Sequence, residues 1–331
     1  MPIVAPCEAK TNTTPDFPMG WFSVARANEL SIGGVKRVVA FDRELALYRT
    51  ESGVPVVQDA FCPHLGAHLG VDGRVVGERI QCPFHGWEFG KSGDCESIPY
   101  CEEIPSRAKL RTWPTTEKNG EVYMWFHPEN SEPQWEVPEL TELGHPDWSS
   151  PRHAEFDVPA HVQDIAENSC DPVHFAYVHR QPDVPPSEVT VEDNGRILHL
   201  HSDASQAEIP SQLHATVYQP GFALVRNTYG PGAEMVVYNS AQPVNRHETR
   251  MRWTLMVRRE IEELAGDEVM NGIISGLGDD YPIWANKVHR HRPIFCKADD
   301  TLVTFRKWVR QFYIKPIVAS GNTESIANYS A

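Results

Sequence analysis

Two short stretches, CPHLGAH at residues 62–68 and CPFHGW at residues 82–87, decide the fold of the first part of the chain. Each stretch places one cysteine and one histidine on a loop that proline stiffens and glycine allows to fold closely. Two cysteines with two histidines can hold zinc tetrahedrally, or they can hold a [2Fe–2S] cluster with both histidines on one iron. The residue types alone leave these alternatives open. The four candidate ligands are Cys62, His64, Cys82 and His85.

Around these stretches the sequence reads as short strands between turns. The chain has 331 residues, which is long for one ordinary core, so two domains are expected. Runs rich in β-branched and aromatic residues indicate strands, and we predict an all-β first domain over residues 17–130. These runs lie at residues 37–41, 45–48, 54–58, 74–76 and 122–126.

Strands and helices in mixed order follow a proline-rich linker at residues 127–150. Their patterns predict an α+β second domain over residues 131–331, with an antiparallel sheet and helices of the helix-grip type. Helices are expected at 161–170, 268–289 and 303–312, and strands at 197–202, 213–218, 223–227, 234–239 and 250–257.

Composition excludes several classes of protein. A net charge of −15 and a pI near 5.4 argue against nucleic-acid binding, which requires a basic surface. No apolar run approaches the roughly 18 residues of a transmembrane helix, and the N-terminus lacks the layout of a signal peptide. The seven scattered cysteines do not suggest a disulfide framework. We therefore expect a cytoplasmic protein whose clustered cysteines bind metal.

A second group of candidate ligands lies in the segment from Asp164 to His179. Two histidines with one carboxylate are the ligands of non-haem Fe(II) oxygenases. Five residues of an ideal helix turn about 500°, so His174 and His179 can converge only if the helix breaks or ends between them. Pro172 makes a break near Asp171 plausible, with Asp171 as a helix cap. By itself, a polar helix with two histidines is the simpler interpretation.

The first two stretches, read as CPHLGAHLG and CPFHGW, resemble the two boxes of a Rieske domain. This resemblance implies that Cys62 and Cys82 bind one iron of a [2Fe–2S] cluster, and that His64 and His85 bind the other. The respiratory type has an additional cysteine in each box, where this chain has Ala67 and Phe84. The pattern is therefore that of the oxygenase and ferredoxin type, and His68 is expected to be a surface residue.

The string D-x-x-x-N-x-x-D-x-x-H-F-x-x-x-H closely resembles the iron motif of Rieske oxygenases. The resemblance implies that His174, His179 and a distant aspartate hold Fe²⁺ where O₂ reacts. In the family that the motif resembles, two residues separate the ligand aspartate from Ile-Trp, which implies Asp280, with Asp279 as the alternative. A helix cap just after Gly278 is the structural role that the aspartate could have instead.

The same family implies two supporting residues. The Asp171 carboxylate is expected to face the second nitrogen of an iron-bound histidine and to pass electrons from the Rieske histidine of a neighbouring subunit in a homotrimer. Asn168 is expected just outside the iron ligands.

Further stretches are most similar to the cholesterol 7-desaturases and 3-ketosteroid 9α-hydroxylases: SIPYCEEIP after the second box, and FRKWVRQFY near the end. The resemblance implies a steroid or sterol substrate that is hydroxylated or desaturated. Two alternatives stay open, an oxygenase acting on an aromatic or other small apolar molecule and a non-catalytic electron-transfer protein. Candidate pocket residues, which could equally be sheet core, are Tyr218, Phe222, Val225, Met235, Tyr238 and Trp253.

No flavin or nicotinamide fingerprint is visible in the sequence. Electrons from NAD(P)H are therefore expected to arrive through a separate reductase, directly or through a ferredoxin. The basic residues Arg107, Lys109 and Arg111 could form a docking site for an acidic partner, but a solvated edge strand is the better explanation for them.

Overall fold

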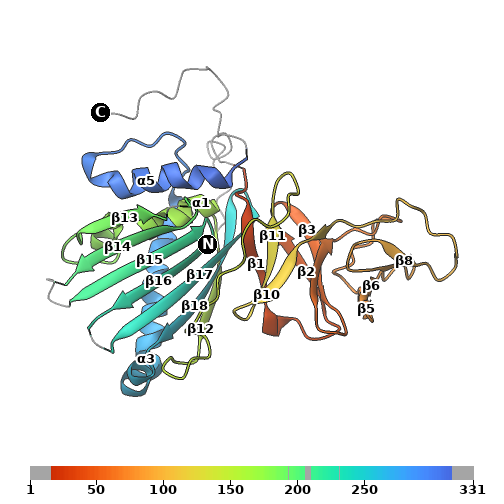
Figure 1. Cartoon of the computed structure of the whole chain (residues 1–331), viewed down its shortest axis with the longest axis horizontal. Coiled ribbons are helices and arrows are strands. Elements are labelled where there is room, and N and C mark those ends of the chain that lie inside the picture. Colours follow the sequence, from red (N-terminus) through yellow and green to blue (C-terminus); the bar gives the residue numbers. More distant parts are fainter. Residues whose placement is uncertain (1–15, 193, 206–209, 231, 315–331) are drawn as a thin grey trace.

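The computed structural model describes residues 16–314 except 193, 206–209 and 231. It contains several small antiparallel sheets formed by the first part of the chain and one large antiparallel sheet formed by the second part (Figure 1). Helices cover the large sheet, and the architecture agrees with the α+β prediction. The predicted domain boundary after residue 130 falls between strands β11 (Glu121–Phe126) and β12 (Arg152–Val158) and stays a prediction.

Three small sheets make up the first part of the chain. One has the order β1-β11-β10, the second β2-β3-β4-β9 and the third β5-β6-β7-β8. The strands not yet located are β1 (Gly20–Arg26), β2 (Val35–Ala40), β3 (Arg43–Arg49), β4 (Pro55–Asp59), β5 (Arg74–Val76), β6 (Arg79–Gln81), β7 (Glu88–Phe89), β8 (Cys95–Ser97), β9 (Thr112–Trp113) and β10 (Thr115–Lys118), and a short 3-10 helix, η2 (Ala27–Glu29), follows β1.

The prediction of strand at Phe41 is wrong. Phe41 and Asp42 have φ of 56° and 57° and form the two-residue turn between β2 and β3. Turns with positive φ at both positions match the twist of the flanking strands. A phenylalanine is tolerated there because its ring is buried and stacks on Phe126 at a centroid distance of 4.1 Å.

The large sheet has seven strands in the order β12-β18-β17-β16-β15-β14-β13, all antiparallel. The strands after β12 are β13 (Ser187–Val191), β14 (Leu198–Ala204), β15 (Ser211–Gln219), β16 (Phe222–Thr228), β17 (Glu234–Asn245) and β18 (Glu248–Val257). Short helices lie between β12 and β13: α1 (Val162–Ala166), the 3-10 helix η3 (Glu167–Cys170) and α2 (Val173–Tyr177).

The predicted helix 268–289 differs from the observed one at both ends. Helix α3 (Arg259–Leu277) begins directly after β18, and η4 (Gly278–Asp280) with α4 (Tyr281–Asn286) follows it. The prediction therefore began too late and ended too late, and the structure kinks α3 at Gly266, where φ is 61°. The chain then forms η5 (Lys297–Asp299), α5 (Asp300–Trp308) and η6 (Val309–Phe312), close to the prediction of a helix at 303–312.

The two parts of the chain are joined by polar contacts between β1 and the large sheet. The Gln219 side chain accepts a hydrogen bond from the Trp21 backbone N–H at 3.0 Å and donates one to the Trp21 carbonyl at 2.6 Å. The Gln219 amide thereby makes the two backbone hydrogen bonds that a strand next to β1 would otherwise make. A side chain at Gly20, where φ is 151°, would overlap the Gln219 amide.

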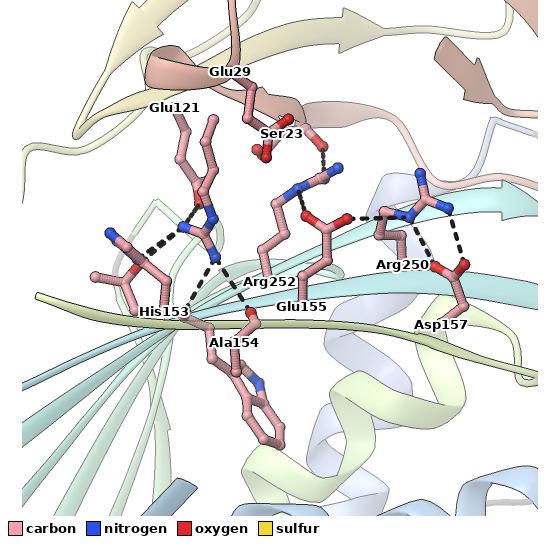
Figure 2. A network of polar contacts seen from close by, with 12 residues as sticks. Ser23, Glu29, Glu121, His153, Ala154, Glu155, Asp157, Arg250 and Arg252 are labelled. Carbon is pink, nitrogen blue, oxygen red and sulfur yellow. Dashed lines mark hydrogen bonds and ion pairs between the residues drawn. The ribbon is translucent and has the colours of Figure 1, made fainter. Parts of the chain in front are cut away.

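Charged side chains form a second junction, shown in Figure 2. Arg252 on β18 donates to the Ser23 carbonyl and to Glu155, each at 2.8 Å, and its side chain is 2% exposed. Arg26 pairs with the buried carboxylate of Glu121 at 3.4 Å and also donates to backbone carbonyls of β12 and β18. Burial outweighs the attraction of the nearby arginines and raises the pKa of Glu121.

Candidate active site

The two cysteine–histidine loops have the same backbone hydrogen bonds. In the first, Gly66 N–H donates to the Cys62 carbonyl and Cys62 N–H donates to the carbonyl of Ala67. In the second, Gly86 and Trp87 occupy the corresponding positions relative to Cys82. Gly66 and Gly86 have φ of 75° and 74°, so both tight turns require glycine. The sequence thus forms two equivalent turns that face each other.

The four candidate ligands of these turns come together and fit a Rieske cluster. Cys62 and Cys82 are both 3% exposed, and the His64 and His85 rings lie 4.7 Å apart between centroids. Burial, with a further contribution from neighbouring Cys82, raises the pKa of the Cys62 thiol to about 12. His64 Nδ1 is buried and has no hydrogen-bond partner within the described chain. Two buried thiols beside an unpartnered imidazole nitrogen are the donor set that such a cluster requires.

Aromatic and apolar side chains surround this site. The Trp87 ring stacks on His64 with centroids 4.6 Å apart, and its Nε1–H donates to the Tyr100 hydroxyl at 2.8 Å. Leu65 and Phe84, which flank the two histidines in sequence, are 65% and 60% exposed. The histidine edge of the site is therefore an open, apolar surface.

The sequence predicts that His68 lies at the surface, but its side chain is partly buried. Its Nδ1 accepts the N–H of Gly70 at 3.0 Å, and its Nε2 lies 3.3 Å from the Glu44 carboxylate. It holds the loop of the first box in place.

The second candidate site satisfies the geometric condition derived from the sequence. Helix α2 ends at Tyr177, between the two histidines, so their rings can converge. His174 Nε2 lies 4.0 Å and His179 Nε2 3.3 Å from oxygens of the Asp280 carboxylate. Ligand atoms of all three residues lie within 4.8 Å of one another. The Asp280 carboxylate raises the pKa of His179.

The two candidate aspartates differ in burial and contacts. Asp280 is 7% exposed and faces both histidines, whereas Asp279 is exposed. Two imidazoles and one carboxylate that are directed at the same point fit a mononuclear iron, because this ligand set leaves coordination positions open for O₂. The geometry therefore favours Asp280 over Asp279.

Asp171 lies beside the triad, but with a different contact from the one expected. Its carboxylate accepts the N–H groups of Val173 and His174 at 3.1 and 3.3 Å and so caps α2. The backbone carbonyl of Asp171, not its carboxylate, is bonded to His174 Nδ1. With the proton on Nδ1, the Nε2 lone pair of His174 points toward Asp280 and His179.

The segment that carries His174 is fixed by buried polar contacts. Glu167 is 9% exposed and pairs with Arg306 of α5 at 2.5 Å. Asp164 lies 3.0 Å from His289 Nδ1, on the chain after α4. The C-terminal helices thus hold the segment that contains His174.

Comparisons with known proteins identify the family of the chain. The model of the 3-ketosteroid 9alpha-hydroxylase C-terminal domain matches residues 124–313, and the Rieske [2Fe-2S] domain model matches residues 20–114. A cholesterol 7-desaturase of Caenorhabditis elegans is 31% identical over 90% of this chain and 77% of its own length. The oxygenase component of a 3-ketosteroid-9-alpha-monooxygenase of Rhodococcus rhodochrous is 28% identical over 90% of this chain and 83% of its own. The chain belongs to the Rieske oxygenases.

Solved structures show the same fold. The QL mutant of Pseudomonas putida CBB5 NdmA with theobromine has a TM-score of 0.75 at 22% identity, covering 88% of this chain and 89% of its own. Dicamba monooxygenase bound to dicamba has a TM-score of 0.71 at 20% identity, covering 88% and 96%. The predictions of family and fold class are confirmed.

This Rieske oxygenase is therefore an oxidoreductase that uses a [2Fe–2S] cluster, mononuclear iron and O₂. The words "oxygenase component" in the relatives' names imply that a separate reductase supplies its electrons. Within the described part of the chain, no helix has the length and apolar character needed to cross a membrane.

A cavity of about 320 Å³ in this oxygenase opens onto the triad. It lies between the large sheet and helices α1 to α4, and its walls are mainly apolar. Four of the predicted pocket residues line it: Phe222, Val225, Met235 and Trp253. Asn168 also lines it, as expected for a residue next to the iron ligands.

Two predicted pocket residues do not line the cavity. Tyr218 packs beside Phe222, and the Tyr238 hydroxyl contacts the Tyr123 hydroxyl on β11 of the Rieske part. Side chains alternate across a strand, so Tyr238 points away from the face that carries Met235. Sequence reasoning missed two polar residues of the cavity, Asn227 and Asn239, which strand alternation from Val225 and Met235 could have found.

The basic residues proposed for partner docking do not form a continuous surface. Lys109 pairs with Asp94 at 2.6 Å, and the Arg111 guanidinium stacks 3.4 Å above the centre of the Trp113 ring. These contacts favour a solvated edge over a docking site for the basic residues.

Proposed function

We propose that this oxygenase hydroxylates or desaturates a steroid or sterol. The observation that carries the proposal is the apolar cavity at the triad, in the domain that matches the ketosteroid hydroxylase model. Its volume of about 320 Å³ lies within the range of pockets that hold drug-sized apolar ligands. We also propose the domain limits 17–130 for the Rieske domain and 131–331 for the catalytic domain.

In this proposal Cys62, Cys82, His64 and His85 hold the [2Fe–2S] cluster, and His174, His179 and Asp280 hold the Fe²⁺. The bound iron supplies the activation of O₂ that the family performs. The carbonyl of Asp171 holds the proton of His174 on Nδ1 and thereby presents Nε2 as the ligand atom. Asp280 is buried, so its carboxylate keeps one orientation toward both imidazoles.

The cavity walls orient the substrate and keep water away from the reacting carbon. Val237 and Trp253 come from neighbouring strands, and Ile165 covers them from α1. Exclusion of water strengthens electrostatic interactions inside the site and limits side reactions.

Two amide side chains provide polar contacts within this apolar cavity. Asn239 and Asn227 both line it, and their side chains form no hydrogen bond with any other described residue. On β16, Asn227 lies four residues after Ala223, which is the cross-strand partner of Asn239. At about 3.3 Å per residue, the two amides are therefore about 13 Å apart along the strand direction. A rigid molecule with an oxygen at one or both ends could therefore be bound at those ends.

We propose that electrons cross between subunits of a homotrimer. In Figure 1 strands β5, β6 and β8, which flank the cluster loops, lie at the opposite end of the molecule from the large sheet. Leu65 and Phe84 at the cluster edge are exposed and apolar, which suits contact with a neighbouring catalytic domain. The Asp171 carboxylate is the proposed bridge from the neighbour's His85, and it meets His174 through the backbone N–H that it accepts. A closed head-to-tail ring satisfies this contact in every subunit.

A separate reductase, directly or through a ferredoxin, is proposed to deliver the electrons of NAD(P)H. We also propose a cytoplasmic location, as expected from the sequence.

The proposal is tested by O₂ consumption with a reductase across sterols, ketosteroids and aromatic acids. A steroid should stimulate consumption and yield a coupled oxidised product. Coupled product from aromatic acids alone would transfer the assignment to the alternative substrate class. A protein that contains the cluster but no mononuclear iron would instead be an electron carrier.

A further inference from the structure

Three histidines gather on the face of the large sheet opposite the substrate cavity. His199 and His201 lie on β14 and His214 on β15. His201 and His214 are direct partners across the two strands, and His199 is paired with Thr216, one step along the same face. Since Leu213 and Ala215 of β15 line the cavity, strand alternation places His214 on the other side.

His214 lies close to each of the other two rings. The His199 and His214 centroids are 5.3 Å apart, nearly the 5.2 Å that separates His174 and His179 in the triad. The His201 and His214 centroids are 6.4 Å apart, and both of these side chains are exposed. Exposed histidines turn between rotamers at little cost, so the third ring can close the remaining gap.

The surrounding charges favour a cation. Glu192 lies 3.3 Å from His199 Nε2, and Glu188 is the partner of His201 on β13. A carboxylate on one ring nitrogen directs the other nitrogen to a metal, as is usual for metal-bound histidines. His199 Nδ1 now contacts the Thr216 hydroxyl at 3.2 Å, a bond that a cation can replace.

A cation also lies beside the three histidines, because Arg226 on β16 is the cross-strand partner of His214. The Arg226 charge is balanced by ion pairs with Glu142 and Glu234.

We propose that His199, His201 and His214 form a surface site for a divalent transition metal such as Zn²⁺, separate from the iron centre. Three imidazoles are an established zinc ligand set that leaves a position open to solvent. The site lies on the opposite side of the sheet from the cavity, and it does not depend on the identity of the oxidised substrate.

The test is a titration of the untagged, iron-loaded protein with zinc chloride against a competing chromogenic chelator. We expect one zinc to bind per chain while the iron content stays constant. The double variant His201→Ala/His214→Ala should weaken zinc binding by at least about tenfold, and Glu192→Gln by about tenfold. A matched control, His145→Ala, removes an exposed histidine elsewhere and should leave the affinity unchanged.

Two results would overturn the proposal. Zinc could bind equally well to the parent and the double variant, as it would at the exposed thiols of Cys101 and Cys296. Alternatively, zinc uptake could be matched by loss of mononuclear iron, which would place the zinc in the triad. Circular dichroism of the double variant checks that the sheet is intact, since both histidines are exposed.

Discussion

Replacing Arg252 by methionine should weaken the junction between the Rieske and catalytic domains. The guanidinium is almost fully buried and donates to the Ser23 carbonyl and the Glu155 carboxylate, each at 2.8 Å. A hydrogen bond from a charged donor contributes about 1.5–3 kcal/mol. Because Glu155 is 37% exposed, solvent screens its ion pair, which adds less than about 1 kcal/mol.

Methionine fills most of the volume of arginine, so little cavity energy is added. We therefore expect the free energy of unfolding to fall by about 2–3 kcal/mol. For a domain of this size the melting temperature should drop by about 4–10 °C. Cluster absorbance follows the first domain and far-ultraviolet circular dichroism follows the large sheet. Both transitions should move, because Arg252 joins β18 to β1.

Arg250→Met is the matched control. Arg250 lies two residues earlier on the same strand and binds Asp157 through two hydrogen bonds, but both side chains are partly exposed (Figure 2). Its loss should cost no more than about 0.5 kcal/mol. If both variants lowered the melting temperature equally, burial would not be what makes the Arg252 contacts stronger than those of Arg250.

Asp280→Ala should abolish turnover and mononuclear iron while the cluster absorbance persists, and Asp279→Ala should retain iron; metal analysis distinguishes the two ligand assignments. Cys62→Ser should remove the cluster and leave the mononuclear iron. Asp171→Asn should keep its iron yet lose about 10–100-fold in activity, with slow cluster oxidation after rapid mixing with substrate and O₂; normal oxidation would make Asp171 a helix cap only. Asn239→Leu should lower kcat/KM about tenfold for a steroid whose oxygen it binds, the loss of one such hydrogen bond, and equal activity would exclude that contact.

The sequence was most informative where chemistry dictates residue type. The boxes around Cys62 and Cys82 were recognisable because a cluster requires fixed donors and glycines at fixed positions. The convergence of His174 and His179 was predictable as a condition, since helix geometry forbids it unless the helix ends between them. Which group would hold His174 Nδ1 depended on the local turn, and the structure assigned it to a carbonyl.

The pocket was harder to predict because the aromatic type of a residue does not reveal its face. Met235 and Tyr238 are three residues apart on one strand, so they cannot both point into the same cavity. Between Val217 and Gln219 the pairing register shifts, which strict alternation does not anticipate. The helix predicted at 268–289 was displaced toward the C-terminus relative to α3, in which Gly266 has a non-helical φ of 61° and joins two helical segments across a kink.

The bond between Gln219 and Trp21 has a consequence for domain exchange. A chimera of this catalytic domain with a foreign Rieske domain would keep Gln219 but could lose its two hydrogen bonds to the backbone of residue 21. To keep them, the new strand would need a glycine followed by a residue with an unpaired backbone N–H and carbonyl. The bulk of any other side chain at position 20 would displace the amide. Because Gln219 also borders the cavity, such a graft would disturb the wall of the substrate site as well as the junction. Besides the contacts of Arg26 and Arg252, compatibility between the two halves thus depends on Gly20, Trp21 and Gln219, none of which is a proposed metal ligand.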